Sequence, residues 1–111
     1  MKTLAEQIMC NKLVKTKKKI LNKINILQAK LLKNNEDQTA LDTFQKELFE
    51  IRKDLRSWPT VPQINIAVRR IDDILAIIHA GYLILHEQGV QKEIDVKKFV
   101  VAMKLKTSRV I

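Results

Sequence analysis

The chain of 111 residues is poor in the residues that build loops, crosslinks and stacking surfaces. It contains one cysteine, two glycines and two prolines, and 5% of its residues are aromatic. Because Cys10 is the only cysteine, no disulfide can form within the chain, which favours a reducing compartment. The scarcity of glycine and proline predicts few turns and therefore long helices.

The sequence also lacks a long apolar run. The longest apolar stretch, 74–85, is too short to span a bilayer and contains His79. Near the start of the chain, Glu6 and Lys12 interrupt the apolar residues, so no stretch of signal-peptide length follows Lys2. We therefore expect a cytoplasmic protein that does not insert into membranes.

Residues that carry catalysis or bind metals are few and far apart in the sequence. A helix brings two ligands to one ion at spacings of three or four, whereas His79 and His86 are seven residues apart. The only serines, Ser57 and Ser108, do not occur in a strand–turn–helix context. Cys10 lies among apolar residues at helical spacing, as is typical of a small core residue. The chain has no glycine-rich phosphate loop.

The charged residues around position 73 have a structural explanation. Arg69 with Asp72 or Asp73, and Arg70 with Asp73, have the spacing of ion pairs on a helix, which explains these residues without an acid–base site. Tyr82 and His86 are one helical turn apart, and we expect a hydrogen bond between them. These patterns predict a protein that is not an enzyme and needs neither a cofactor nor a metal.

Apolar residues recur at alternating steps of three and four, the pattern of helices that pack side by side. The second segment has Leu41, Phe44, Leu48, Ile51, Leu55 and Trp58, and the third has Ile64, Val68, Ile71, Leu75, Ile78, Tyr82 and Leu85. We predict one all-α domain over 1–111, a small helical bundle. It consists of three long antiparallel helices and a short C-terminal helix, over about 3–33, 39–57, 62–88 and 95–108.

The helix boundaries follow from capping and breaking residues. Thr39 suits the amino-terminal cap of the second helix, and Pro59 stops that helix. Gly89 suits the end of the third helix, and Asp95 suits the start of the fourth. Residues 103–111 also alternate like a strand, but the face of the fourth segment favours a helix.

The third and first helices carry more apolar surface than a simple hairpin buries. A second apolar stripe on the third helix indicates a helix that is central in the bundle or shared with a partner chain. This candidate self-association stripe consists of Ile74, Ile77, Gly81 and Ile84. Gly81 equally suits a close helix crossing within one chain. The first helix exceeds the second in length, so other helices or a second subunit must cover Leu4, Ile8, Leu13 and Val14. We predict a homodimer or a subunit of a larger complex.

Positive charge dominates both ends of the chain. The formal net charge is +9, and residues 1–33 hold nine lysines against one glutamate. Residues 92–111 hold six basic and two acidic residues. Such a field favours polyanions or an acidic protein surface. Codon bias is an alternative explanation for this charge, because a genome of low GC content favours both lysine and isoleucine, and the chain is rich in both.

Six lysines of the first helix form a stripe along one side. At about 100° per residue they lie within an arc of about 80°, and the stripe is about 30 Å long. These residues, the lysine stripe, are Lys12, Lys15, Lys19, Lys23, Lys30 and Lys33. Lys17, Lys18, Lys97, Lys98, Lys104, Lys106 and Arg109 complete the predicted nucleic-acid-binding residues, on the expectation that the fourth helix lies beside the stripe.

The composition of the stripe suggests how it binds. Lysine neutralises phosphates without regard to sequence, whereas base reading calls for arginine, asparagine or glutamine. We therefore predict a non-enzymatic accessory or regulatory subunit of a nucleoprotein assembly that holds DNA or RNA backbones with low specificity. The alternative is an adaptor or inhibitor that docks its basic face on an acidic protein. A third interpretation is a solvated face that maintains solubility.

Two further patterns are weaker. The third and fourth helices resemble a helix-turn-helix, but about six residues join them where the motif normally uses three or four. A basic amphipathic helix can also lie on an anionic membrane. Residues 1–43 contain no aromatic residue to anchor such a helix.

Overall fold

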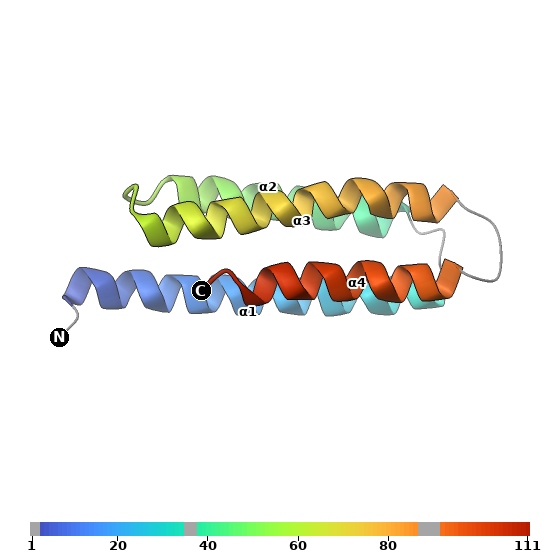
Figure 1. Ribbon diagram of the computed structural model, residues 1–111, viewed down its shortest axis with the longest axis horizontal. Helices are drawn as coiled ribbons and strands as arrows, with labels where there is room; N and C mark the ends of the chain where they lie inside the picture. The colour runs from blue at the N-terminus through green and yellow to red at the C-terminus, as the bar shows by residue number, and fades with distance from the viewer. Residues whose placement is uncertain (1–2, 35–37, 87–91) are drawn as a thin grey trace.

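The apolar heptads fold into four antiparallel helices, as the computed structural model shows for residues 3–34, 38–86 and 92–111 (Figure 1). The helices are α1 (Leu4–Lys33), α2 (Gln38–Arg56), α3 (Pro62–His86) and α4 (Lys92–Ser108). This part of the chain contains no strand, so the predicted all-α bundle is confirmed. The fourth helix, with 17 residues, is the shortest.

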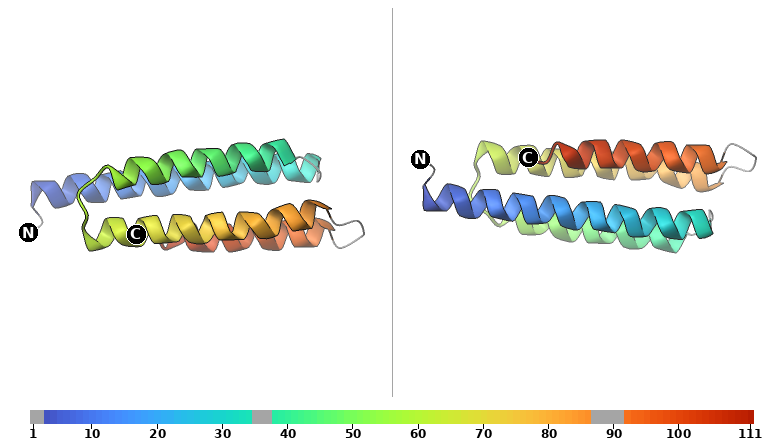
Figure 2. Two further views of the ribbon diagram at one scale, coloured as in Figure 1. Left: turned by 90° about the horizontal axis from the view of Figure 1, so that it is seen from above. Right: turned by 90° about the horizontal axis from the view of Figure 1, so that it is seen from below.

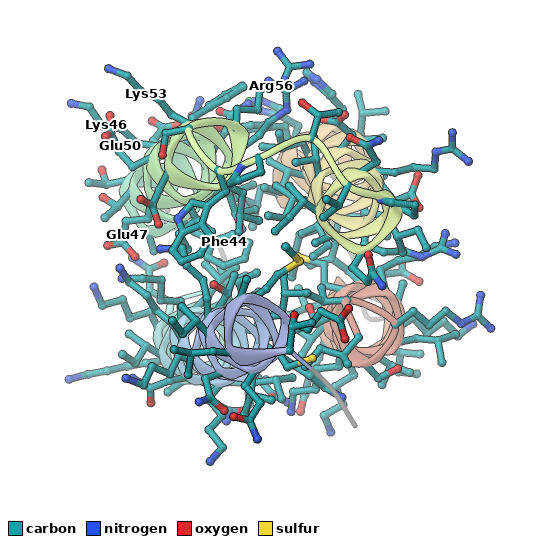
Figure 3. The ribbon with its side chains drawn as sticks, turned by 90° about the vertical axis from the view of Figure 1, so that its left-hand side faces the viewer. Phe44, Lys46, Glu47, Glu50, Lys53 and Arg56 are labelled. Carbon is teal, nitrogen blue, oxygen red and sulfur yellow. The ribbon has the colours of Figure 1, made fainter. Side chains whose placement is uncertain are left out.

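The four helices form the corners of a square when viewed along the bundle (Figure 3). Each helix packs against two neighbours: α1 lies beside α2 and α4, and α3 lies beside α2 and α4. The bundle measures 54 × 21 × 18 Å, and the two further views show that the first turns of α1 project beyond the other helices (Figure 2). Because α2 and α4 are each neighbours of both α1 and α3, they occupy diagonally opposite corners of the square.

Most of the core consists of residues that the heptads predict, but on α3 Val68 and Tyr82 are half-buried while Ala67 and Ile74 are buried. On α1, Ile20, Ile24 and Leu27 are buried, and Trp58, which follows α2, is half-buried. Burial of each such aliphatic side chain contributes about 1.5–3 kcal/mol relative to leaving it exposed. The bundle is therefore held together by its heptad residues.

Two helix starts differ from the prediction. Helix α2 begins at Gln38, so Thr39 lies inside it, and α4 begins at Lys92, so Asp95 lies inside that helix. The earlier start of α4 adds a turn that places two acidic residues near the positive end of the helix dipole. Glu93 also gains an ion pair with Lys97 at 3.3 Å. Gly89 and the predicted end of the third helix at 88 lie outside the described residues.

Residues near the carboxyl end of the chain are helical up to Ser108 rather than extended. Met103, Thr107 and Val110 are buried at spacings of four and three, whereas Leu105 and Arg109 are exposed. The hydroxyl of Thr107 donates a hydrogen bond to the Met103 carbonyl at 2.8 Å. A helical face therefore explains this segment, and the alternating pattern was misleading.

The apolar stripe of α3 is used within the chain. Ile74 and Gly81 are buried, and Ile77 and Ile84 pack partly buried against the core. A Cβ atom on Gly81 would lie 2.5 Å from Cζ of Phe99 in α4. The internal crossing considered for Gly81 is thus the one present, and Ile77 and Ile84 are left only partly exposed.

The beginning of α1 remains largely uncovered. Leu13 is buried, but Leu4 is 75% exposed, Ile8 49% and Val14 40%. We expected other helices or a second subunit to bury these four residues, and within the chain only Leu13 is buried.

Candidate functional site

The lysine stripe lies on a continuous helix. Helix α1 runs unbroken from Leu4 to Lys33, and Thr3 caps it by accepting a hydrogen bond from the backbone N–H of Glu6 at 3.2 Å. Thr16, in the middle of this run, is buried. The predicted single rod is therefore confirmed, and the stripe follows the edge of α1 that faces α2.

Two stripe lysines are ion-paired with carboxylates of α2. Lys12 pairs with Asp54, and its Nζ atom lies 5.0 Å from the centre of the Trp58 ring. Lys23 pairs with Glu47 at 2.5 Å. Both lysine side chains are 23% exposed. Contrary to the prediction of six lysines free to bind phosphates, these two are held by the chain itself.

A groove of about 680 Å³ lies between α1 and α2 and is lined on its α1 side by lysines of the stripe. Its basic lining residues are Lys12, Lys15, Lys19 and Lys23, and its acidic ones are Glu47, Glu50 and Asp54. The apolar lining comes from Ile8, Ile51 and Trp58. The groove therefore joins an apolar surface to a mostly positive edge on α1 and a negative edge on α2.

A second hollow of about 320 Å³ continues the groove along the same two helices. Lys19, Lys23 and Glu47 line both hollows. Further along, Ile26 and Lys30 of α1 form part of the second hollow. The combined depression, the α1/α2 groove, extends from Ile8 to Lys30, which is about 33 Å at 1.5 Å per residue.

Four stripe lysines remain without an ion pair among the described residues. Lys15, Lys19, Lys30 and Lys33 are all exposed. Lys30 and Lys33 lie in the last turn of α1, where positive charge interacts favourably with the helix dipole. Of the six stripe lysines, these four can contact an anionic partner without breaking an ion pair within the part of the chain that the structure describes.

The basic residues of α4 do not extend the stripe. Lys104 contacts Gln28 of α1 at 3.4 Å, and Gln28 lies about 150° around the helix from Lys12 and Lys23. Helix α4 therefore packs on a different side of α1 from α2, as in the square arrangement of Figure 3. Lys97 is paired with Glu93 on its own helix. Of the other predicted residues, Lys18, Lys98 and Arg109 are exposed and Lys17 and Lys106 are half-buried.

The acidic edge of the groove is the feature that the sequence analysis missed. Glu47, Glu50 and Asp54 recur at steps of three and four beside the heptad of α2. This spacing predicts that the three carboxylates share one side of the helix, but it does not show which neighbouring helix they face. In the end view, Glu47 lies on the side of α2 nearest α1, whereas Lys46 and Lys53 project outward and Phe44 turns inward (Figure 3).

Polar residues elsewhere are explained by structural contacts. Of the ion pairs predicted on α3, the one between Arg70 and Asp73 is present at 3.2 Å, whereas Asp72 pairs with Arg52 of α2 at 2.6 Å. Tyr82 does not bond to His86 but donates a hydrogen bond to Asp42 of α2, because α2 covers that side of α3. Burial and the neighbouring carboxylate raise the pKa of Tyr82 to about 12.

The structure offers little to the remaining functional classes. The described residues contain no group of three or more side chains suited to holding a metal ion. None of the helices in this part of the chain has the length and apolarity needed to cross a bilayer. Helices α3 and α4 lie side by side and antiparallel, unlike the steeply crossed pair of a helix-turn-helix (Figure 1).

Comparison with known proteins finds no matching family model, no matching curated protein and no matching solved structure. Up-and-down helical bundles serve many functions, so the fold alone assigns none. The α1/α2 groove is therefore the feature of the molecule from which a function can be inferred.

Proposed function

We propose that the chain is a non-enzymatic adaptor or inhibitor that docks an acidic amphipathic helix of a protein partner in the α1/α2 groove. The observation that carries this proposal is the combination of an apolar lining with the ammonium groups of Lys15 and Lys19, which form no ion pair with any described residue. An amphipathic helix would bury its apolar side against Ile51 and Trp58 and place carboxylates beside these lysines.

The dimensions of the groove favour an elongated ligand. Its two hollows share Lys19, Lys23 and Glu47 in their linings and together extend about 33 Å along α1. A helix of about six turns has this length. A small metabolite would fill only a fraction of the space.

The charges of the groove specify the flanks of the partner helix. On the α1 side, Lys15 and Lys19 call for acidic residues. On the α2 side, Glu50 calls for neutral or basic residues. A nucleic-acid backbone is negative on every side and would approach Glu47, Glu50 and Asp54 unfavourably. The acidic edge therefore favours a protein partner over a polyanion.

A peptide experiment tests the proposal directly. The probe is a helical peptide with leucine on one face and glutamate along one flank, and the control peptide has lysine in place of glutamate. We expect fluorescence anisotropy to show binding of the acidic peptide only. Lys15→Glu combined with Lys19→Glu should weaken that binding, whereas Lys46→Glu with Lys53→Glu, on the outward side of α2, should not. Equal effects of the two double variants would contradict the proposal.

Capture from the native host provides the complementary test. Wild-type protein should retain a partner after nuclease treatment, and the Lys15→Glu, Lys19→Glu variant should lose it. The Lys46→Glu, Lys53→Glu variant is the matched control and should keep it. Loss of the partner on nuclease treatment would instead favour nucleic acid.

Nucleic-acid backbone binding is the second candidate. It is favoured by the exposure of Lys15, Lys19, Lys30 and Lys33, which extend over about 27 Å without ion pairs among the described residues. In that case, affinity for a random DNA duplex should fall steeply with salt. Lys30→Glu with Lys33→Glu should then reduce it as strongly as the Lys15→Glu, Lys19→Glu pair.

A cytoplasmic location is part of both proposals because a single cysteine suits a reducing compartment.

A further inference from the structure

Helix α4 is apolar on its outer side as well as on the side that faces the bundle. Val96, Val100 and Met103 are buried in the core. On the opposite side, Ile94 is 53% exposed, Val101 64% and Leu105 52%. A helix that is apolar on both sides is expected to be covered on both.

The three exposed residues are aligned along one side of α4. At about 100° per residue, Ile94, Val101 and Leu105 lie within an arc of about 40°, and the row is about 17 Å long. The exposed apolar residues of α1 are more numerous and lie within a wider arc of about 120°, and α3 exposes only Ile66 and Leu83 among its described large apolar residues. The row on α4, which we call the α4 outer stripe, is narrower than the apolar arc of α1.

We propose that the α4 outer stripe pairs with the same stripe of a second copy of this chain, with the two α4 helices antiparallel. In that arrangement Ile94 of one copy packs beside Leu105 of the other, and the two Val101 side chains lie near the two-fold axis. A two-fold contact between identical surfaces closes on itself and yields a dimer.

The distribution of charge along α4 favours this orientation. Glu93 and Asp95 lie in the first turn of the helix, and Lys104, Lys106 and Arg109 lie near its end. In an antiparallel pair, the acidic start of each helix meets the basic end of the other. Glu93 and Lys104 lie on the same flank of the stripe, so each faces its counterpart across the interface. A parallel pair would place like charges together.

The inference is independent of the proposed α1/α2 groove. Because α4 and α2 occupy diagonal corners of the bundle, the outer face of α4 points away from α2 (Figure 3). The residues that line the groove do not contribute to the α4 outer stripe. Failure of one proposal therefore leaves the other untouched.

Sedimentation velocity over a range of protein concentrations tests the dimer. The wild type should shift from 12.9 kDa to twice that mass as concentration rises. Val101→Asp places a charge at the centre of the interface and should raise the dimer dissociation constant about tenfold or more. Leu83→Asp changes a residue of α3 that is 69% exposed and should leave it unchanged. A wild type that stays monomeric, or equal effects of the two variants, would overturn the proposal.

Charge reversal tests the antiparallel orientation. Glu93→Lys alone and Lys104→Glu alone should each weaken the dimer, because each creates like-charge contacts between the copies. The double variant restores opposite charges across the interface and should recover most of the wild-type affinity. Circular dichroism checks that each variant keeps its helix content. Weakening in the double variant equal to the sum of the two single effects would overturn the orientation.

Discussion

Lys23 of α1 and Glu47 of α2 form an ion pair of 2.5 Å across the α1/α2 groove. With the Lys12–Asp54 pair, it converts part of a lysine stripe into a structural connection between two helices. Lys15 and Lys19, between these pairs, and Lys30 and Lys33, beyond them, form no ion pair with another described residue and can contact a partner. The division between held and available lysines is the basis of the groove proposal.

Removal of these ion pairs should cost little stability. Both are partly exposed, and exposed ion pairs typically contribute about 0–1 kcal/mol. We therefore expect Glu47→Gln to lower the free energy of unfolding by less than about 1 kcal/mol, and less at high salt. Urea unfolding followed by circular dichroism at two salt concentrations measures this. A much larger loss would show that the pair is essential to the packing of α1 on α2.

Enlarging Gly81 should destabilise the bundle. The added Cβ of Gly81→Ala would lie 2.5 Å from the Phe99 ring, which is itself buried. Overpacking of this kind costs about 1–3 kcal/mol, against a gain of about 1 kcal/mol from the helix propensity of alanine. Phe99→Leu should relieve the clash, so the double variant should be more stable than the sum of the two single effects. Additive effects in chemical denaturation would contradict the close contact.

Truncation of the α3 core should be costly, and truncation of its surface should not. Ile78 is fully buried, and Leu83 on the same helix is 69% exposed. Ile78→Ala should reduce the free energy of unfolding by about 2–5 kcal/mol. Leu83→Ala should change it by less than about 0.5 kcal/mol. Similar losses for both variants would indicate that α3 is oriented differently in the bundle.

Alkaline pH should weaken the bundle through Tyr82. Its pKa is raised from the ordinary value of 10.0 to about 12, so the folded state favours the protonated phenol. The resulting stabilisation is present below pH 10 and is lost as the pH rises toward 12. Tyr82 is the only tyrosine, so absorbance of the tyrosinate reports its titration alone.

Two variants separate the causes of that shift. Asp42→Asn removes the carboxylate that accepts the Tyr82 hydrogen bond and should lower the pKa of Tyr82, without restoring the ordinary value, because burial contributes most. Tyr82→Phe should abolish this contribution to the alkaline loss of stability. Titration of wild-type Tyr82 at its ordinary pKa would contradict the contact with α2.

Most of the fold could be predicted because its information is local. Residues such as Leu48 and Ile71 recur at helical spacing, and Pro59 marks the break between α2 and α3. The start of α4 was less predictable because Asp95 is a good capping residue, while the extra turn gains the Glu93–Lys97 pair. Two plausible starts thus competed within one short segment.

The candidate site could be predicted only from one side. The alignment of Lys15 and Lys19 follows from helical geometry alone, and the structure places them on one edge as expected. The carboxylates opposite them depend on how α2 is rotated and aligned against α1, which is a tertiary property. The same limitation applied to Gly81, because nothing in the sequence identified Phe99 as its neighbour.

The position of Trp58 makes the groove observable without any label. It is the only tryptophan of the chain, it lines the α1/α2 groove, and the ammonium group of Lys12 lies above its ring. Any ligand that displaces Lys12 or excludes water from the indole will alter the intrinsic emission of the protein. The molecule therefore carries its own spectroscopic sensor at the place where we expect a partner to bind.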